Sequence, residues 1–182
     1  MQALAKLKTS FKENGTTTAG NSSQVSDGAA AVLLMRRSTA MNLGLGILGK
    51  FVDFAVAGVP PRIMGVGPAL AIPKLLKQNS LSIADIGVFE VNEAFASQAS
   101  YCAKVLGIPA ERLNPLGGAI ALGHPLGCTG ARLVATILPQ MRKRKIRYGV
   151  VSMCIGTGMG AAALIELESD SNGKGGELKG KL

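Results

Sequence analysis

Apolar segments of strand length alternate along the chain with longer segments of helical periodicity, and this alternation limits the possible folds more than any other feature. Aliphatic and β-branched runs bounded by Gly or Pro indicate strands, whereas apolar residues at spacings of three and four indicate helices. Such alternation predicts an α/β fold with helices layered on a sheet. Strands are predicted at residues 28–35, 47–59, 87–92, 148–154 and 160–167, and helices at 69–78, 94–106 and 125–141.

One internal repeat stands out. Gly28-Ala-Ala-Ala-Val-Leu-Leu-Met35 returns as Gly160-Ala-Ala-Ala-Leu-Ile-Glu-Leu167, 132 positions later, a period too long for a solenoid. It indicates duplication of a domain-sized half, although a chance match between two Ala-rich strands is the alternative. On this interpretation residues 1–42 end a first half, 45–168 form a complete second half, and the polar, Gly-rich residues 169–182 form a disordered tail. We therefore expect the chain to be a fragment.

Composition excludes several classes of protein. No apolar run approaches the roughly 20 residues that cross a bilayer, and the start of the chain lacks the apolar centre of a signal peptide. The three cysteines are widely spaced, unlike the framework of a small secreted domain. They also lack C-x-x-C spacing, so no metal site is predicted. The sequence indicates a soluble protein from a reducing compartment.

The formal charge of +9 is concentrated in residues 142–147 and in the C-terminal lysines. It could serve an anionic partner, or it could be a solvated helix C-terminus, where cations complement the helix dipole. We favour the second interpretation. With aromatic residues at 4% and no Trp, the stacking surfaces that bind nucleic acid are missing, so no nucleic-acid partner is expected.

Two side chains at predicted strand or loop ends could carry chemistry. His124, the single histidine, lies in a Gly-rich loop and is followed by Pro125, a residue that can open a helix. Cys154 ends an apolar strand, ahead of Gly156 and Gly158. Cys154 could be a buried hydrophobe, or it could be a reactive thiol beside a backbone N–H that binds an oxyanion. Such strand ends are where α/β proteins usually place reactive groups.

Other candidate features have weaker contexts. Cys102 and Cys128 fall within a predicted helix and a predicted helix start, and we assign both to packing. Residues 44–49 match G-x-G-x-x-G, but they precede a strand and no acidic residue follows at about 20 positions. A dinucleotide site is therefore not expected.

Three segments together resemble the C-terminal motifs of the thiolase family. They are Asn92-Glu-Ala-Phe95, the Gly-rich loop Gly117–Gly130 with Gly123-His124-Pro125, and Cys154-x-Gly156-x-Gly158. Residues 18–31 are similar to the family segment that precedes its second half. The resemblance extends from residue 4 to residue 168, and residues 149–163 are most similar to the peroxisomal 3-ketoacyl-CoA branch.

The resemblance implies a thiolase-like fold of two similar βαβαβαββ halves, each with a mixed five-stranded sheet and helices on its faces. It also implies transfer of an acyl group between a 3-ketoacyl-CoA and coenzyme A, within fatty-acid β-oxidation. Coenzyme A and acyl-CoA would then be substrates, with no further cofactor. The complete enzyme would be a homodimer located in the peroxisome.

Catalytic roles follow from the same resemblance. In the family, a first-half cysteine takes the acyl group, and the histidine matched by His124 activates it. Asn92 matches a residue that holds a water in the oxyanion site. Cys154 matches the general acid/base that exchanges a proton with the α-carbon, and the Gly156 N–H would stabilise the second oxyanion. Of the binding residues, Ser23 matches a position lining the coenzyme A pocket, and Phe95 one beside the thioester.

The chain also departs from the family pattern. No cysteine precedes Cys102, so the first-half nucleophile is absent, and we expect no thiolase activity from this chain alone. The strand at 28–35 would lack sheet partners and expose an apolar surface. Pro139 should kink or shorten the helix at 125–141. The alternative is a catalytically dead thiolase-like module that binds acyl-CoA or a subunit. A ketoacyl synthase is disfavoured, because those enzymes place a second His or a comparable residue near this region.

Overall fold

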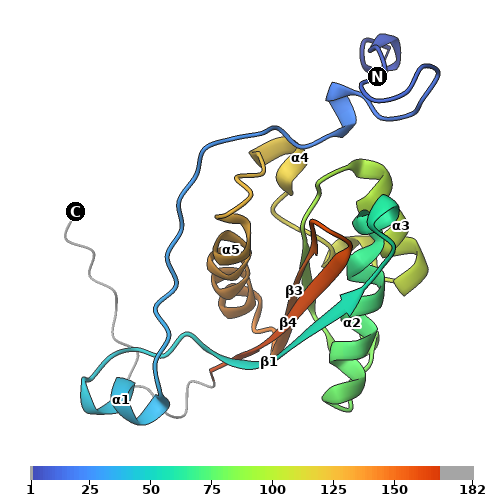
Figure 1. Cartoon of the computed structure of the whole chain (residues 1–182). Coiled ribbons are helices and arrows are strands. Elements are labelled where there is room, and N and C mark those ends of the chain that lie inside the picture. The colour runs from blue at the N-terminus through green and yellow to red at the C-terminus, as the bar shows by residue number, and fades with distance from the viewer. Residues whose placement is uncertain (1, 169–182) are drawn as a thin grey trace.

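The computed structural model describes residues 2–168, and its centre is one four-stranded sheet (Figure 1). The strands are β1 (Gly49–Gly58), β2 (Val88–Val91), β3 (Tyr148–Ile155) and β4 (Met159–Leu167). Their order across the sheet is β1-β4-β3-β2. β4 is antiparallel to both of its neighbours, whereas β2 runs parallel to β3. The sheet is therefore mixed, as expected.

Helices cover both faces of this sheet, with α2 and α3 on one side and α5 on the other (Figure 1). The α-helices are α1 (Arg37–Asn42), α2 (Gly67–Gln78), α3 (Ala96–Leu106), α4 (Ala119–Leu122) and α5 (Thr129–Arg144). Short 3-10 turns span Leu4–Lys6, Ala19–Asn21, Pro61–Val66, Ile83–Asp85 and Ala110–Arg112. The expected α/β layering is confirmed.

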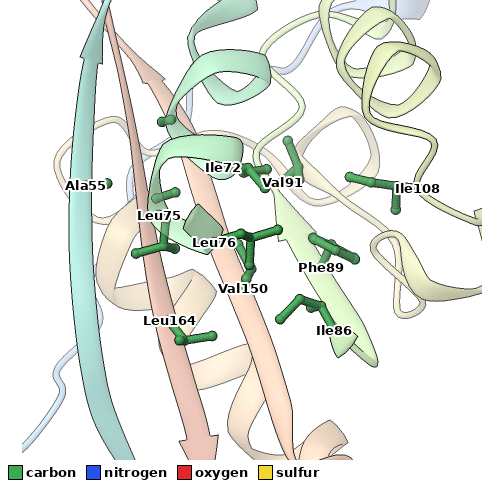
Figure 2. Packing of buried hydrophobic residues seen from close by; sticks show 12 residues of the cluster. Ala55, Ile72, Leu75, Leu76, Ile86, Phe89, Val91, Ile108, Val150 and Leu164 are labelled. Carbon is green, nitrogen blue, oxygen red and sulfur yellow. The ribbon is translucent and has the colours of Figure 1, made fainter. Parts of the chain in front are cut away.

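Two buried clusters hold the layers together, one on each face of the sheet. On the α2 side, Ile72 and Leu75 pack against Phe89 and Leu164, all inaccessible or nearly so (Figure 2). On the α5 side, a second cluster contains Val88, Leu133, Ile137, Met141, Val151, Ala163 and Ile165. Neighbouring residues of β3 and β4 thus enter opposite clusters. This is why these strands are almost uniformly apolar in sequence.

The resemblance implies a five-stranded sheet, and here the sheet has four strands with one isolated bridge beyond β2. Leu113 pairs in parallel with Phe89 at the outer edge of β2, and the pairing goes no further. Asn114 then takes a positive φ of 43°, and Pro115 lacks an N–H. The Asn114 side chain instead accepts from Val91 N at 2.8 Å and donates to Val91 O at 2.9 Å. An amide side chain therefore completes the hydrogen bonds that a fifth strand would have made.

Residues 28–35, expected as a strand, are extended but belong to no strand. Figure 1 shows this part of the chain running past α5 to α1. Leu33 and Leu34 are 79% and 68% exposed. The prediction of a strand at these residues is therefore wrong, whereas the expected lack of sheet partners and the exposed apolar surface are observed, because no segment of residues 2–168 pairs with them.

The expectation that Pro139 would shorten its helix was wrong. α5 continues to Arg144, past Pro139. Pro139 is exposed, and so is Ala135, whose carbonyl loses its helical partner and can bind water instead. The buried stripe of Leu133, Ile137 and Met141 anchors both sides of the proline to the sheet. Packing therefore outweighs one lost hydrogen bond.

The basic run lies exposed at the end of α5, with Arg142, Lys143 and Arg144 in its last turn. This position supports the solvated helix C-terminus interpretation. Across residues 2–168, no helix is long and apolar enough to span a membrane.

Two glycines set the distance between α2 and the sheet. A Cβ on Gly67 would lie 2.5 Å from the Gly160 Cα, and a Cβ on Gly160 would overlap the backbone of Gly67. We predict that Gly160→Ala lowers the free energy of unfolding by about 3 kcal/mol or more, since neither backbone can move aside easily. Urea unfolding measures this change. Gly58→Ala, in β1 with open space around it, is the matched control and should cost far less; equal losses would contradict the close-packing explanation.

Candidate active site

Parallel pairing of β2 and β3 brings two of the expected site residues to one edge of the sheet. Val91 is opposite Ser152, and Asn92 N donates to Ser152 O at 2.9 Å. Cys154 lies two residues further along β3, half-buried. The carboxyl ends of both strands therefore present Asn92 and Cys154 to the same region, as the resemblance implies.

His124 joins this edge through a chain of three hydrogen-bonding side chains. Asn92 Nδ2 lies 3.2 Å from His124 Nε2, and His124 Nδ1 lies 2.7 Å from Thr129 Oγ1. The Thr129 hydroxyl donates to Pro125 O at 3.1 Å, which uses its only proton. Its oxygen must then accept from His124 Nδ1–H. This assigns the imidazole lone pair to Nε2, where it accepts from the Asn92 amide N–H.

The loop that carries His124 is fitted against the chain upstream. His124 N donates to Gln24 O at 2.9 Å. Gly123 has a φ of 94°, and a Cβ there would overlap the Ser26 hydroxyl. A Cβ on Gly28 would lie 2.6 Å from the Pro125 ring. Residues 24–28 and the histidine loop therefore approach so closely that glycine is needed on both sides.

The same upstream segment connects Ser23 to Phe95. Ser23 N donates to Ala94 O at 3.0 Å, and Ser22 forms an antiparallel bridge with Phe95. The Phe95 ring meets that of Phe11 edge to face, with centroids 5.8 Å apart. A shallow hollow of about 280 Å³ lies here, lined by Phe11, Thr17, Phe95 and Ser97. Ser23 and Phe95 are among the site residues expected from the sequence, whereas Phe11, which has no motif of its own, is not.

Glu93 links the glycine-rich loop to the end of β2. Its carboxylate accepts from Asn114 Nδ2 at 2.9 Å and from Ile120 N at 3.3 Å. It also rests against Gly118, where any side chain would overlap it. The acidic residue beside Asn92 is therefore placed to hold the loop, and its oxygens are already occupied.

Gly156 opens the turn between β3 and β4, exposed and with no atom within 4 Å of its would-be Cβ. Thr157 and Gly158 follow with φ angles of 72° and 101°. Val59 N donates to Gly158 O at 2.9 Å, which ties the turn to the end of β1. The backbone beyond Cys154 is thus fixed in a tight turn, with open space beside Gly156 for a ligand.

Burial controls the charge of both reactive groups. It lowers the pKa of His124, and the positive charge of Arg132 lowers that pKa further. Burial also raises the pKa of the Cys154 thiol. Both effects disfavour the charged form. Near neutral pH the site therefore holds a neutral imidazole able to accept a proton and a neutral thiol able to give one.

Some expected groups are not joined directly. Within residues 2–168, no hydrogen bond connects Cys154 with His124. Cys102 is fully buried in α3, in keeping with a packing role. No group of three or more His, Cys, Asp or Glu side chains in the described part of the chain could hold a metal ion.

Comparison with known proteins gives the family. The thiolase C-terminal domain family matches residues 45–167, and the thiolase N-terminal domain family matches residues 1–38. The chain belongs to the thiolase family. Peroxisomal 3-ketoacyl-CoA thiolase B of Mus musculus is 69% identical over 167 residues, and the human peroxisomal enzyme is 65% identical. Each match covers 91% of this chain but only 39% of the relative, so the chain spans about two fifths of these thiolases.

Solved thiolases have the same fold. The dimeric peroxisomal thiolase of Saccharomyces cerevisiae is 60% identical with a TM-score of 0.87, over 92% of this chain and 42% of that one. Human mitochondrial 3-ketoacyl-CoA thiolase in complex with CoA is 40% identical with a TM-score of 0.86, and the match covers 92% of this chain and 43% of that one. The thiolase-like fold expected from the sequence is confirmed, with four strands in place of five.

The raised pKa of Cys154 gives a prediction for chemical modification. Because only the thiolate is alkylated, the rate at Cys154 should reach half of its maximum at a higher pH than for an exposed cysteine in a reference peptide. Iodoacetamide labelling over a pH series, followed by peptide mass spectrometry, measures it. In the urea-unfolded chain the half-maximal rate at Cys154 should occur at a lower pH than in the folded chain, because the thiol is then no longer buried. A native midpoint below that of the peptide would contradict a buried thiol.

Proposed function

We propose that this chain supplies the acid/base half of a 3-ketoacyl-CoA thiolase site, which cleaves 3-ketoacyl-CoA with coenzyme A to acyl-CoA and acetyl-CoA. The observation that carries the proposal is the Asn92–His124–Thr129 chain, which leaves the lone pair of the imidazole on Nε2. The names of the relatives support the substrate class and a role in β-oxidation.

The first half-reaction needs a base, an acid and two oxyanion sites. A cysteine thiol from the first half would lose its proton to His124 Nε2 and attack the 3-keto carbon. The bond between C2 and C3 then breaks, and the electron pair of that bond goes to C2. The acyl group stays on the cysteine as a thioester. Cys154 would donate its proton to C2 and so release acetyl-CoA. A neutral, buried thiol is suited to this donation, because its proton is retained until the carbanion forms.

The second half-reaction reverses these roles. Cys154, now a thiolate, would take the proton of the incoming coenzyme A thiol, whose sulfur attacks the thioester carbon. The bond from that carbon to the first-half cysteine then breaks, acyl-CoA leaves, and the cysteine sulfur takes back the proton held by His124 Nε2. Developing negative charge on the thioester oxygens needs fixed donors. The Gly156 N–H would serve one oxyanion, and His124 with a water held by Asn92 the other. Asn92 Oδ1 is buried without a hydrogen-bond partner, which supports a bound water at that position.

The substrate would reach this edge past Ser23 and Phe95. The hollow beside Phe95 has aromatic and hydroxyl side chains, suited to a chain that is partly apolar and partly amide. A related thiolase has been solved with CoA bound, which supports the same ligand here. We also propose a homodimeric complete enzyme and a peroxisomal location, from the dimeric yeast thiolase and the names of the relatives.

The division of the chain into residues 1–42, 45–168 and 169–182 stays a proposal, and the last segment lies outside the described residues. The two family matches, at 1–38 and 45–167, support the first boundary. One solved relative is described as two core domains of identical topology, which supports the duplication proposed from the repeat.

Replacing His124 tests the proposed base. In a complete protein that includes a first half with its cysteine, His124→Ala should abolish thiolysis, since no other group offers a lone pair at that point. Loss of the enolate absorbance of the 3-ketoacyl-CoA substrate measures the rate. Lys143→Ala, exposed at the far end of α5, is the control and should keep full activity. A full rate in the His124→Ala protein would refute the assignment.

Asn92→Ala tests the oxyanion role. Losing one donor should lower kcat by about 10²–10³-fold while the protein stays folded. KM should change far less than kcat, because the donor acts on charge that develops in the transition state. A loss confined to KM would show that Asn92 only binds substrate.

Without the nucleophile, the chain alone should show no thiolase activity and could instead act as a binding module. This second candidate is favoured by one observation, that the first cysteine is Cys102, buried in α3. Calorimetric titration with coenzyme A, and separately with an intact thiolase, distinguishes the two. Turnover by the chain alone would overturn the inactivity proposal, and tight binding to either would favour the module.

A further inference from the structure

A row of buried polar groups lies on the α5 side of β2, next to the Asn92–His124 pair. Glu90 is fully buried, and its Oε1 accepts from Gln140 Nε2 at 2.7 Å. Its other oxygen, Oε2, has no hydrogen-bond partner. Glu90 and Asn92 are two residues apart on one strand and so project to the same side. The reaction proposed above uses neither Glu90 nor Gln140.

Arg132 is a cation on α5, the helix that also carries Gln140. It follows Thr129 by three residues, close to one turn of α5, so both lie on the same side of the helix. Both of its terminal guanidinium nitrogens are buried and have no partner. A buried charge without a partner is costly, and Glu90 Oε2 is the oppositely charged group that also lacks one. The two unpaired groups complement each other in charge.

Arg132 acts on both ends of the row. Burial raises the pKa of Glu90, and the hydrogen bond from Gln140 and the charge of Arg132 oppose part of that rise. Burial lowers the pKa of His124, and the charge of Arg132 lowers it further. The guanidinium is therefore within Coulombic reach of the carboxylate and of the imidazole. Thr129, which precedes Arg132 by about one turn of α5, fixes the imidazole by accepting from its Nδ1–H.

We propose that Arg132 is a positioning residue of the site: its buried guanidinium, one turn along α5 from the Thr129 that holds the imidazole, adds to burial in keeping the His124 ring uncharged with its lone pair on Nε2. Removing the positive charge would let the ring take up a proton on Nε2, and a protonated ring cannot receive one from a thiol. The consequence for catalysis rests on the proposed function, whereas the effect on the charge of His124 does not.

Other ionisable groups on the surrounding elements are few. They are Glu93 after β2, Cys154 on β3, Cys128 at the start of α5, and Asp27 on the segment that crosses the histidine loop. Glu93 is already held by Asn114 and Ile120, and Asp27 is exposed. Cys154 is uncharged near neutral pH because burial raises its pKa. Arg132 is thus the buried cation in this set.

The single histidine makes a direct test possible on this chain without any activity. With histidine labelled by ¹³C and ¹⁵N, one imidazole resonance set reports His124. NMR titration gives its pKa in the wild type, Arg132→Gln, Arg132→Lys and Glu90→Gln. Arg142→Gln is the matched control: the same substitution on the same helix, but exposed and about 15 Å further along it.

We expect the pKa of His124 to rise in Arg132→Gln, to stay low in Arg132→Lys, and to fall further in Glu90→Gln, where the cation loses its counter-charge. Arg142→Gln should leave it unchanged. An unaltered pKa in folded Arg132→Gln, or an equal rise in Arg142→Gln, would overturn the proposal. If Arg132→Gln does not fold, Glu90→Gln decides: a fall supports the proposal and no change refutes it.

In a complete active enzyme, Arg132→Gln should also move the acidic limb of the kcat/KM profile to higher pH, and Arg132→Lys should restore it. If the imidazole titration shifts as expected while this profile does not move, the role of Arg132 stands and the proposed role of His124 as base fails. The two proposals can therefore be separated.

Discussion

The parallel hydrogen bonding between β2 and β3 sets the position of almost every group in the candidate site. Because the two strands run in the same direction, their carboxyl ends meet at one edge, and the residues just beyond Val91 and Ser152 become neighbours. Asn92 and Cys154 are far apart in sequence, yet this pairing fixes both. An antiparallel pairing would have put them at opposite edges. Both strands lie in the buried centre of the fold, so little freedom remains for the groups at their ends.

His124 depends on a second level of organisation, since it comes from a loop. Three separate contacts hold that loop: Glu93 at its beginning, Gln24 at the histidine backbone, and Thr129 at the imidazole. The glycines at 118 and 123 allow two of these approaches, because a side chain there would overlap Glu93 or Ser26. Glycine loses more conformational entropy on folding than any other residue, and at these two positions that loss accompanies the close contacts that hold the histidine loop.

The region under the site is unusually polar for the interior of a sheet layer. Glu90 and Gln140 are hydrogen-bonded to each other, Arg132 lies on the same helix as Gln140, and each of the three keeps at least one buried atom without a hydrogen-bond partner. Replacing such a group with a hydrophobic residue of similar size is often neutral or even favourable for stability. Its presence beside the histidine therefore favours an electrostatic role over a purely structural one. The apolar cluster of Leu133, Ile137 and Met141 on the same helix supplies the packing that offsets this cost.

The sequence by itself determined the layers, most of the strands and helices, and which side chains are candidates for the reaction. Strong periodicity placed α2 and β3 close to their observed limits, and the glycine-rich context singled out His124 and Cys154. Only the tertiary structure decided three further points. Helix α5 continues past Pro139 because the packing of its apolar stripe outweighs one lost hydrogen bond, which local propensity does not include. The fifth strand gives way to the Asn114 side chain, a substitution visible only once Val91 lies beside it. Phe11 gains its role through contact with Phe95, far away in the chain, so no local pattern carries that information. Thr129 is only five residues from His124, but its contact with the imidazole depends on how the histidine loop folds onto the start of α5.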